Sequence, residues 1–559
     1  MGSPAALVVV VAVPAWSGTT AVDAAWDEGV GPVADALSAG RGCAGLVLAG
    51  RLVEEWSKRR PDAIRQLRDL LASGRVELLA TPLHRPVFSA IPERDAAAQL
   101  SAHTTLLKRI LGVRPLGAWV PHGVWEPTLP RLLAKGGLEW TLLDREWLAD
   151  AGAPAAAVLA VEREGRAVRV LPFGESAGTG LRVVRLGAPG GHTEVALDLL
   201  DRVSGLPSSL LGAARARAYL PAGGPGGLWE RHLLSDAGAD ALHKRMLGVS
   251  RLVRRFETTV GEGRYNDDGP DPHVLQQARR YLHRAQAAEA YAPEPGEADV
   301  HGAFRDRAWR DLLRAELASH RALGMPPCDG RQADVDCDGT AEARLWTESW
   351  AVTLCPRNQG VLTEISHRES AVNALAGRVP VAFRDAWGDE PAARSWELVT
   401  TEPGGDGSMR GVMCADSSLG GVPVRMTKHV HLPARGPMEV RLDIDNRGHE
   451  GARGMLSTEL NVTLGGPRLE GAEEASLSVS VAGGKVPLDE VIELPPIEEV
   501  SIIGWRARME LEPTPAARVR IEPLPQGAAR VVLSWPVELW GRERERRSVR
   551  LNLREEPHG

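Results

Sequence analysis

The residues best suited to chemistry lie close together between positions 117 and 148. This stretch contains Trp119, His122, Trp125 and Glu126. An indole ring can stack on the apolar face of a pyranose ring, and a histidine or a glutamate can move a proton. The combination therefore fits a sugar-binding site, whereas each tryptophan taken alone also fits a buried core position.

Two other groups have the residue types of metal ligands. Asp334, Asp336 and Asp338 alternate as in the opening of a calcium loop, but the later glutamate and the flanking helices of an EF-hand are missing. His429 and His431 alternate on one face of an expected strand, with no third ligand nearby in sequence. We interpret these groups as a solvated turn and as surface histidines, and the sequence predicts neither a metal nor a cofactor.

The composition excludes several classes of protein. The chain has 559 residues, of which 43% are hydrophobic and 25% charged, as is typical of a soluble globular protein. Its 73 acidic and 66 basic residues give a net charge of −7, which argues against nucleic-acid binding. No apolar run approaches the length of about 20 residues that a membrane span needs. The five scattered cysteines indicate reduced thiols in the cytoplasm.

The first 225 residues or so contain short, continuous apolar runs with amphipathic stretches between several of them. Continuous runs are typical of parallel strands that are buried on both faces. The expected strands are Leu7–Val13, Ala44–Ala49, Val76–Ala80, Leu116–Val120, Trp140–Leu143, Val168–Pro172 and Ala216–Leu220. Such β/α steps fit a barrel or a doubly wound sheet, in which reactive residues follow the carboxyl ends of the strands.

Two further regions follow. Residues 235–328 have the pattern of three helices, which we expect to pack on the first region. Residues 329–559 contain short β-rich segments separated by Gly/Pro turns, which favours an antiparallel β-sandwich. We therefore expect domain boundaries at 234 and 328.

The stretch 117–148 also resembles a known family. Ten residues match the pattern Trp-Leu-x-Glu-Arg-Val-Trp-Glu-Pro and its continuation Leu-Ala-x-x-Gly-x-x-Tyr-x-x-Leu-Asp. They are Trp119, Val124, Trp125, Glu126, Pro127, Leu133, Ala134, Gly137, Leu143 and Asp144. This is similar to the third conserved region of glycoside hydrolase family 57, the α-amylase and 4-α-glucanotransferase family.

The resemblance extends over most of the chain. Residues 74–100 are similar to the second region, 278–291 and 303–316 flank the fifth, and 334–342 and 457–466 match the sandwich of the glucanotransferase-type members. It implies an α/β plus all-β fold: an incomplete (β/α)7 barrel with a three-helix segment, followed by an antiparallel β-sandwich.

The departures from the family pattern fall where the resemblance places catalysis. His122 stands at the nucleophilic glutamate. Within 219–229, Pro221 or Ala222 stands at the acid/base aspartate and Gly224 at the glutamate that follows it. The sugar-lining His-x-His-Gln-Pro strand end reads Val10–Pro14.

Two other regions depart as well. The fifth region, Tyr-Trp-His-Gly-x-Phe-Gly-Gly, becomes residues 291–298 and keeps only Tyr291, and Arg85 replaces the glutamate before the proline of the second region. A retaining glycosidase needs two carboxyls about 5–5.5 Å apart, and His122 cannot readily replace a carboxylate nucleophile. The resemblance thus implies a pseudoenzyme rather than an active enzyme.

We expect this relative to bind an α-glucan or to act as a regulatory protein in glycogen or maltodextrin metabolism. An intact family-57 paralogue or another glycogen-metabolism protein would be its partner, with no membrane or nucleic-acid partner. The expected sugar contacts are Trp119, His122, Trp125, Glu126, Asp144 and Tyr291. Three alternatives stay open: an active retaining 4-α-glucanotransferase or α-amylase with relocated carboxylates, an inverting or novel reaction at His122, Glu126 and Asp144, and a structural subunit without a carbohydrate ligand.

Overall fold

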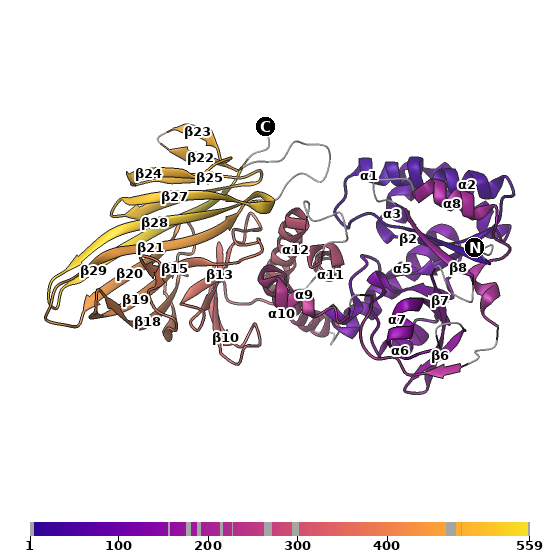
Figure 1. Ribbon diagram of the computed structural model, residues 1–559, viewed down its shortest axis with the longest axis horizontal. Helices are drawn as coiled ribbons and strands as arrows, with labels where there is room; N and C mark the ends of the chain where they lie inside the picture. Colours follow the sequence, from indigo (N-terminus) through magenta and orange to yellow (C-terminus); the bar gives the residue numbers. More distant parts are fainter. Residues whose placement is uncertain are drawn as a thin grey trace. The chain divides into compact units, whose positions relative to one another are not determined.

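The computed structural model forms two compact units, Met1–His232 with Gln286–Ala288 and Leu233–Ala285 with Glu289–Gly559 (Figure 1). It describes residues 5–154, 157–174, 180–186, 192–212, 216–225, 227–261, 271–292, 301–464, 477–481 and 483–556. Among these residues, none of the helices combines the length and the apolarity that a membrane span needs.

The first unit contains a nine-stranded sheet in the order β8-β1-β2-β3-β4-β5-β7-β6-β9. The seven strands from β8 to β7 are all parallel, and β6 runs antiparallel to β7. The strands are β1 Ala6–Val11, β2 Ala44–Leu48, β3 Val76–Ala80, β4 Gly117–Trp119, β5 Trp140–Asp144, β6 Leu159–Arg163, β7 Arg166–Phe173, β8 Leu181–Leu186 and β9 Ala216–Ala218.

Both faces of the parallel strands are buried, which explains their continuous apolar runs. In β1, Val8 and Val10 pack with side chains from the other six parallel strands in one interior cluster. Their neighbours Val9 and Val11 pack with the helices in a second cluster. This two-sided burial is the pattern of a β/α barrel wall.

Short helices connect these strands and cover their outer face. They are α1 Thr19–Ala24, α2 Gly31–Ser38, α3 Gly50–Arg59, α4 Pro61–Ala72, α5 Glu93–Leu111, α6 Leu129–Lys135, α7 Arg145–Asp150 and α8 His192–Leu200, with α9 Arg231–Ser235 at the end of the unit. Helix α4 begins with a proline at its first turn, and α5 ends at Gly112 with φ +82°. Both are residues that favour those positions.

The second unit begins with the three long helices α10 Ala237–Gly261, α11 Pro272–Ala285 and α12 His301–Ala322. They lie where the helical pattern of the sequence places them, and they cluster with the strands that follow. The domain boundaries expected at 234 and 328 stay a prediction. The chain forms two compact units, whereas the sequence predicts three domains.

Two antiparallel sheets complete this unit. One has the order β10-β11-β12-β13-β15-β21-β28-β27-β24, with β14 and β16 at its side, and the other the order β17-β18-β19-β20-β29-β26-β25-β22-β23. A single large apolar core lies between them. The strands are β10 Asp329–Ala333, β11 Glu342–Trp346, β12 Trp350–Cys355, β13 Val361–His367, β14 Val372–Asn373, β15 Ala382–Trp387, β16 Glu390–Pro391, β17 Glu397–Pro403, β18 Met409–Leu419, β19 Val422–Leu432, β20 Met438–Asn446, β21 Ala452–Thr463, β22 Ser478–Val481, β23 Gly484–Pro487, β24 Ile492–Ile497, β25 Val500–Ile503, β26 Ala507–Thr514, β27 Ala517–Leu524, β28 Ala528–Leu539 and β29 Arg544–Glu555.

The predicted fold class is confirmed: a parallel α/β domain, then helices, then an antiparallel sandwich. The expected strands coincide with β1 to β5, β7 and β9, whereas β6 and β8 were not predicted. Strand β8 contains Arg182 and Arg185 within six residues, which hides its apolar pattern.

Candidate functional site

The candidate site begins where β4 ends. After Trp119 the chain enters a tight turn, Pro121–Gly123, in which His122 has φ +57° and Gly123 has φ +66°. A residue with a Cβ in this left-handed region costs on the order of 1–2 kcal/mol, whereas glycine adopts it freely. The surrounding contacts must therefore hold the half-buried His122 in place.

An isolated antiparallel bridge brings a distant segment to this turn. The backbone N–H of Trp125 donates to the carbonyl of Gly223 at 2.6 Å, and the N–H of Gly223 donates to the carbonyl of Trp125 at 3.0 Å. The segment after β4 and the segment after β9 are thus held side by side. These are the two segments to which the sequence resemblance assigns the nucleophile and the acid/base.

Main chain packs against main chain at this bridge. A Cβ built on Gly224 would lie 2.8 Å from the carbonyl oxygen of Gly123 and 3.1 Å from the Cα of Val124. A Cβ on Gly123 would lie 3.2 Å from the ring of Pro225. A carboxylate side chain at position 224 would therefore require the backbone to move.

Glu126 is the carboxylate that follows the bridge directly in sequence. It is half-buried and forms no ion pair with another described residue. Burial raises the pKa of Glu126 above its usual value, and the negative charge of Glu230 raises this pKa further. The position can therefore hold a proton more readily than an exposed glutamate.

Asp144 has a local structural role at the end of β5. It caps α7, because its Oδ1 accepts a hydrogen bond from the backbone N–H of Trp147 at 3.0 Å. Trp147 is buried, and its Nε1 would lie 3.4 Å from a Cβ built on Gly223. Asp144 thus fixes the helix whose tryptophan lies beside the bridge.

Comparison with known proteins identifies the relatives of this arrangement. The family model for glycosyl hydrolase family 57 matches residues 36–173, which include β2 to β7 and the turn at His122. This stretch is similar to glycosyl hydrolase family 57. The chain is 25% identical over 423 residues to an alpha-amylase of Pyrococcus horikoshii, covering 59% of this chain and 61% of the relative.

The chain is also similar to a 4-alpha-glucanotransferase. The 4-alpha-glucanotransferase of Thermococcus litoralis is 21% identical over 423 residues, covering 58% of each chain. The crystal structure of a 4-alpha-glucanotransferase from this organism superimposes with a TM-score of 0.77 at 17% identity, covering 99% of this chain and all of the other. This likeness shows a shared fold. The chain spans about three fifths of the length of the curated relatives it matches.

The two tryptophans of the family-57 signature are inside the first unit. Trp119 is 3% exposed and Trp125 is fully buried. Trp119 packs against Phe173, with ring centroids 5.8 Å apart, and the guanidinium of Arg185 lies 5.9 Å from its ring centroid. Both indoles serve packing in this structure, and their contact with a sugar stays a prediction.

Tyr291 lies in the second unit, whereas the other expected sugar contacts lie in the first. Its hydroxyl donates to the carbonyl of Ala285 at 2.8 Å, its ring meets that of His243 edge to face, and burial raises its pKa. Residues 293–298 of the family's fifth region lie outside the described residues. Pro221 is exposed and Ala222 half-buried, and neither side chain can exchange a proton.

Sequence reasoning missed three residues near these positions. Arg185 follows from β8, the strand that was not predicted, and Trp147 and Glu230 carry no family motif. The signal available was weak: Glu230 follows the Gly-rich segment directly, in the sequence GLWERH. The Trp125–Gly223 bridge joins the residue before Glu126 to the Gly-rich segment that precedes Glu230.

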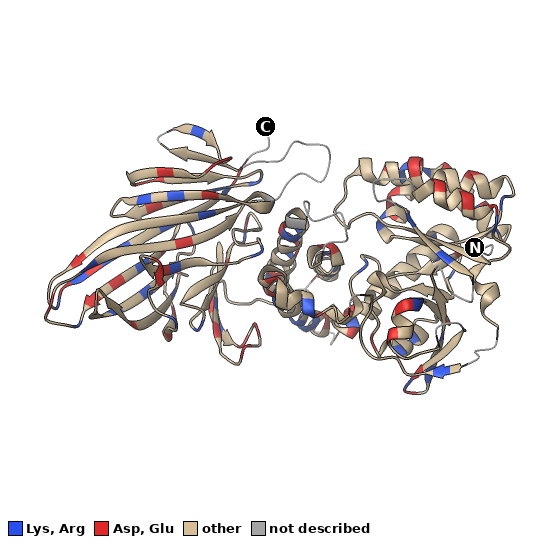
Figure 2. Ribbon diagram, viewed as in Figure 1, with Lys and Arg blue, Asp and Glu red and all other residues tan. Residues whose placement is uncertain are grey.

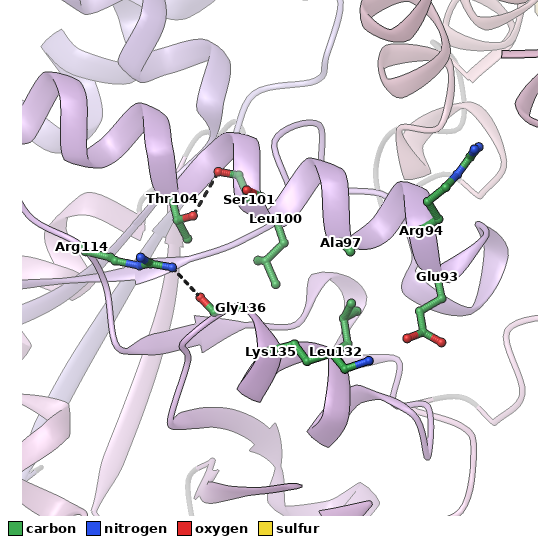
Figure 3. Close-up of a pocket in the computed structure, with 10 residues that line it drawn as sticks. All are labelled: Glu93, Arg94, Ala97, Leu100, Ser101, Thr104, Arg114, Leu132, Lys135 and Gly136. Carbon is green, nitrogen blue, oxygen red and sulfur yellow. Dashed lines mark hydrogen bonds between the residues drawn. The ribbon is translucent and has the colours of Figure 1, made fainter. Parts of the chain in front are cut away.

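One groove of the first unit lies elsewhere, between α5 and α6. It has a volume of ≈ 560 Å³, and Figure 3 shows Arg114 at one end and Glu93 with Arg94 at the other. Leu100 and Leu132 form part of its wall. None of the residues expected at the site lines this groove.

The two metal-ligand candidates have local partners. The ligand atoms of Asp334, Asp336 and Asp338 lie within 4.8 Å of one another, all three residues are exposed, and Asp334 accepts hydrogen bonds from N–H groups of its own turn. His429 on β19 lies 3.2 Å from a carboxylate oxygen of Asp443, and His431 is exposed. The interpretation of these groups as a solvated turn and as surface histidines stays a prediction.

Proposed function

We propose that this chain is a catalytically inactive relative of the α-glucan-acting enzymes, and that it serves as an α-glucan-binding or regulatory partner in glycogen or maltodextrin metabolism. The Trp125–Gly223 bridge is the observation that supports this most strongly. It joins the two segments that would carry a catalytic carboxylate pair, and at their contact stand His122 and the tightly packed Gly224.

The chemistry of glycoside cleavage supports the same proposal. Retaining enzymes place two carboxyls about 5–5.5 Å apart, one to attack the anomeric carbon and one to protonate the leaving oxygen. Asp144 is engaged as the cap of α7, and Pro221 and Ala222 have no titratable group. Glu126 is left as a single partly buried carboxylate beside the bridge.

Two assays on the full-length chain test the proposal. Incubation with maltoheptaose, followed by anion-exchange chromatography, should give no new oligosaccharides, while an active family-57 enzyme run in parallel does. Native electrophoresis through gels with and without glycogen should show retardation by glycogen. Transfer or hydrolysis products from the wild-type chain would contradict the inactive assignment, and the absence of retardation would favour a structural subunit without a carbohydrate ligand.

One observation favours a second candidate, an active transferase or amylase with relocated carboxylates. Glu126 has a raised pKa, and the Glu230 charge that contributes to it belongs to an exposed residue. Two carboxyls with different environments can divide the roles of acid and base. If products form, they should vanish in both Glu126→Gln and Glu230→Gln and persist in Glu146→Gln, at an exposed residue of α7.

The partner and the compartment are part of the proposal. An intact family-57 paralogue or another glycogen-metabolism protein is the partner that a glucan-binding relative would serve. All five cysteines are free thiols, which supports a cytoplasmic location. Co-purification with the full-length chain from its own cells, with and without amylase treatment, would distinguish a direct partner from one bound through a shared glucan.

A further inference from the structure

We propose that Trp540 forms a surface site for a neutral pyranose ring on the sandwich, separate from the barrel. All sixteen tryptophans lie within the described residues, and among them Trp540 is the exposed one, with 66% of its surface accessible to solvent. It lies in the turn that connects β28 to β29. Its exposed indole offers a flat apolar face and an N–H donor to a ligand.

The turn that carries Trp540 is held rigidly. The buried side-chain amide of Asn446 donates to the carbonyl of Trp540 at 3.0 Å and to the carbonyl of Glu450 at 2.8 Å. The backbone N–H of Asn446 donates to the carbonyl of Glu543 at 2.9 Å. These bonds tie the β20–β21 turn to the β28–β29 turn, so the indole needs little ordering before it binds.

The pairing of β21 with β28 places further residues of the site on the outer face of their sheet. Ala452 pairs with Leu539, which places Gly451 opposite Trp540, and a Cβ on Gly451 would lie 3.8 Å from the indole ring. The glycine therefore adds no side chain beside this part of the ring. Two residues further along, Arg453 pairs with Glu538 on the same outer face, because successive side chains of a strand alternate between faces.

Arg453 and Glu538 are suited to bind hydroxyl groups. Both are exposed, and neither forms an ion pair or a side-chain hydrogen bond with another described residue. A guanidinium offers several donors and a carboxylate offers acceptors only. Next to an indole, they complement a ring with apolar C–H faces and a rim of hydroxyls.

The charge of this site selects a neutral ligand. Arg453 and Glu538 carry opposite charges on the same face of the sheet as Trp540, so the site has no net charge and favours neither an anion nor a cation. Acidic and basic residues are interspersed along the sandwich strands in general (Figure 2). A neutral hexopyranose unit of a polysaccharide therefore fits best, and the inference specifies a location for the α-glucan binding of the proposed function.

Affinity electrophoresis of the full-length chain in glycogen gels tests the site. Trp540→Ala should raise the apparent dissociation constant for glycogen at least about tenfold, because truncating a stacking tryptophan removes a dominant contact. Trp540→Phe should keep part of the affinity, and the double variant Arg453→Ala/Glu538→Gln should lose part of it. The control Val399→Ala removes an exposed apolar side chain on β17 and should leave binding unchanged.

The outcomes separate this inference from the proposed function of the barrel. If Trp540→Ala binds glycogen as the wild type does, or if the wild type binds lipid vesicles and not glycogen, the Trp540 site is wrong. If Trp540→Ala loses binding while Glu126→Gln keeps it, the Trp540 site stands and the candidate site at Glu126 does not contribute. Unchanged circular dichroism and melting temperature of each variant show that the fold is intact.

Discussion

Two glutamates in the two units have opposite electrostatic surroundings. Glu316, on α12, is buried, with Arg245 at 2.5 Å and Arg344 at 3.0 Å. Burial alone would raise the pKa of Glu316, but the charges of these arginines outweigh burial and hold the pKa well below its usual value. Burial also raises the pKa of Glu126, and there the nearby charge is that of Glu230, which raises it further.

The difference shows that burial raises the pKa of both carboxylates and that the neighbouring charge decides whether the rise persists. A glutamate held between two arginines stays ionised and serves as a fixed structural charge. A half-buried glutamate without a cation keeps its proton at a higher pH than an exposed glutamate, which a binding or catalytic site can use. The second unit contains the first kind, and the candidate site contains the second.

The Glu316 cluster also connects secondary-structure elements of the second unit. Arg344 on β11 contacts Glu364 on β13 at 3.1 Å as well as Glu316 on α12, and Arg245 on α10 joins the same group. Removing one member of a buried ion cluster leaves its partners charged and uncompensated. Such losses exceed the value of the same pairs at a surface.

The largest expected effect is therefore that of Glu316→Gln. We expect it to lower the free energy of unfolding by about 3–5 kcal/mol, since Arg245 and Arg344 would lose their shared anion. Urea titration followed by circular dichroism measures this change. The matched control is Glu450→Gln, an exposed residue that should change stability by less than about 0.5 kcal/mol. A small loss in Glu316→Gln would mean that the cluster is solvated.

The second prediction concerns the pH dependence of stability and rests on a buried histidine of the first unit. His103 in the first unit is buried, its Nδ1 accepts from the N–H of Thr81, and its Nε2 lies 2.8 Å from the carbonyl of Leu48. Burial lowers the pKa of His103 to about 4. Because the unfolded chain, with a pKa near 6.5, binds the proton first, stability is lost as the pH falls from about 6.5 to 4.

For His103 this loss amounts to up to about 3 kcal/mol between pH 7 and pH 4. Unfolding in urea at several pH values should show a shallower pH dependence for His103→Gln than for the wild type. His192→Gln, at an exposed histidine of α8, should leave the slope unchanged. An unaltered slope in His103→Gln would show that the ring is accessible to protons in the folded state.

The sequence predicts the elements of this protein better than the contacts of its site. Continuous apolar runs located seven of the nine sheet strands of the first unit. Six of them, β1 to β5 and β7, belong to the largely buried parallel part of the sheet, and the seventh, β9, is a short strand without a buried residue. The bridge from Trp125 to Gly223 joins residues 98 positions apart, and no local pattern encodes it. The left-handed backbone of His122 was equally hidden, since a histidine gives no conformational signal of the kind a glycine gives.

The same limit explains the two signature tryptophans. Trp119 and Trp125 match the family pattern, yet a pattern does not distinguish an indole that faces a ligand from one that fills a core. Trp540 matches no motif and is the exposed one. Exposure depends on which side chains cover a ring, and that is a property of the tertiary packing.

The smallest expected effect completes the comparison. Glu126→Gln should leave the free energy of unfolding at pH 7 within about 0.5 kcal/mol of the wild type, on the stabilising side. The uncharged amide removes the repulsion from Glu230 and leaves no cation unpaired, because Glu126 has no ion-pair partner among the described residues. The same urea titration used for Glu316→Gln measures it, with Glu146→Gln as the matched exposed control. A loss of about 2 kcal/mol or more would mean that a cation stabilises Glu126 after all, and the contrast between the two glutamates would then fail.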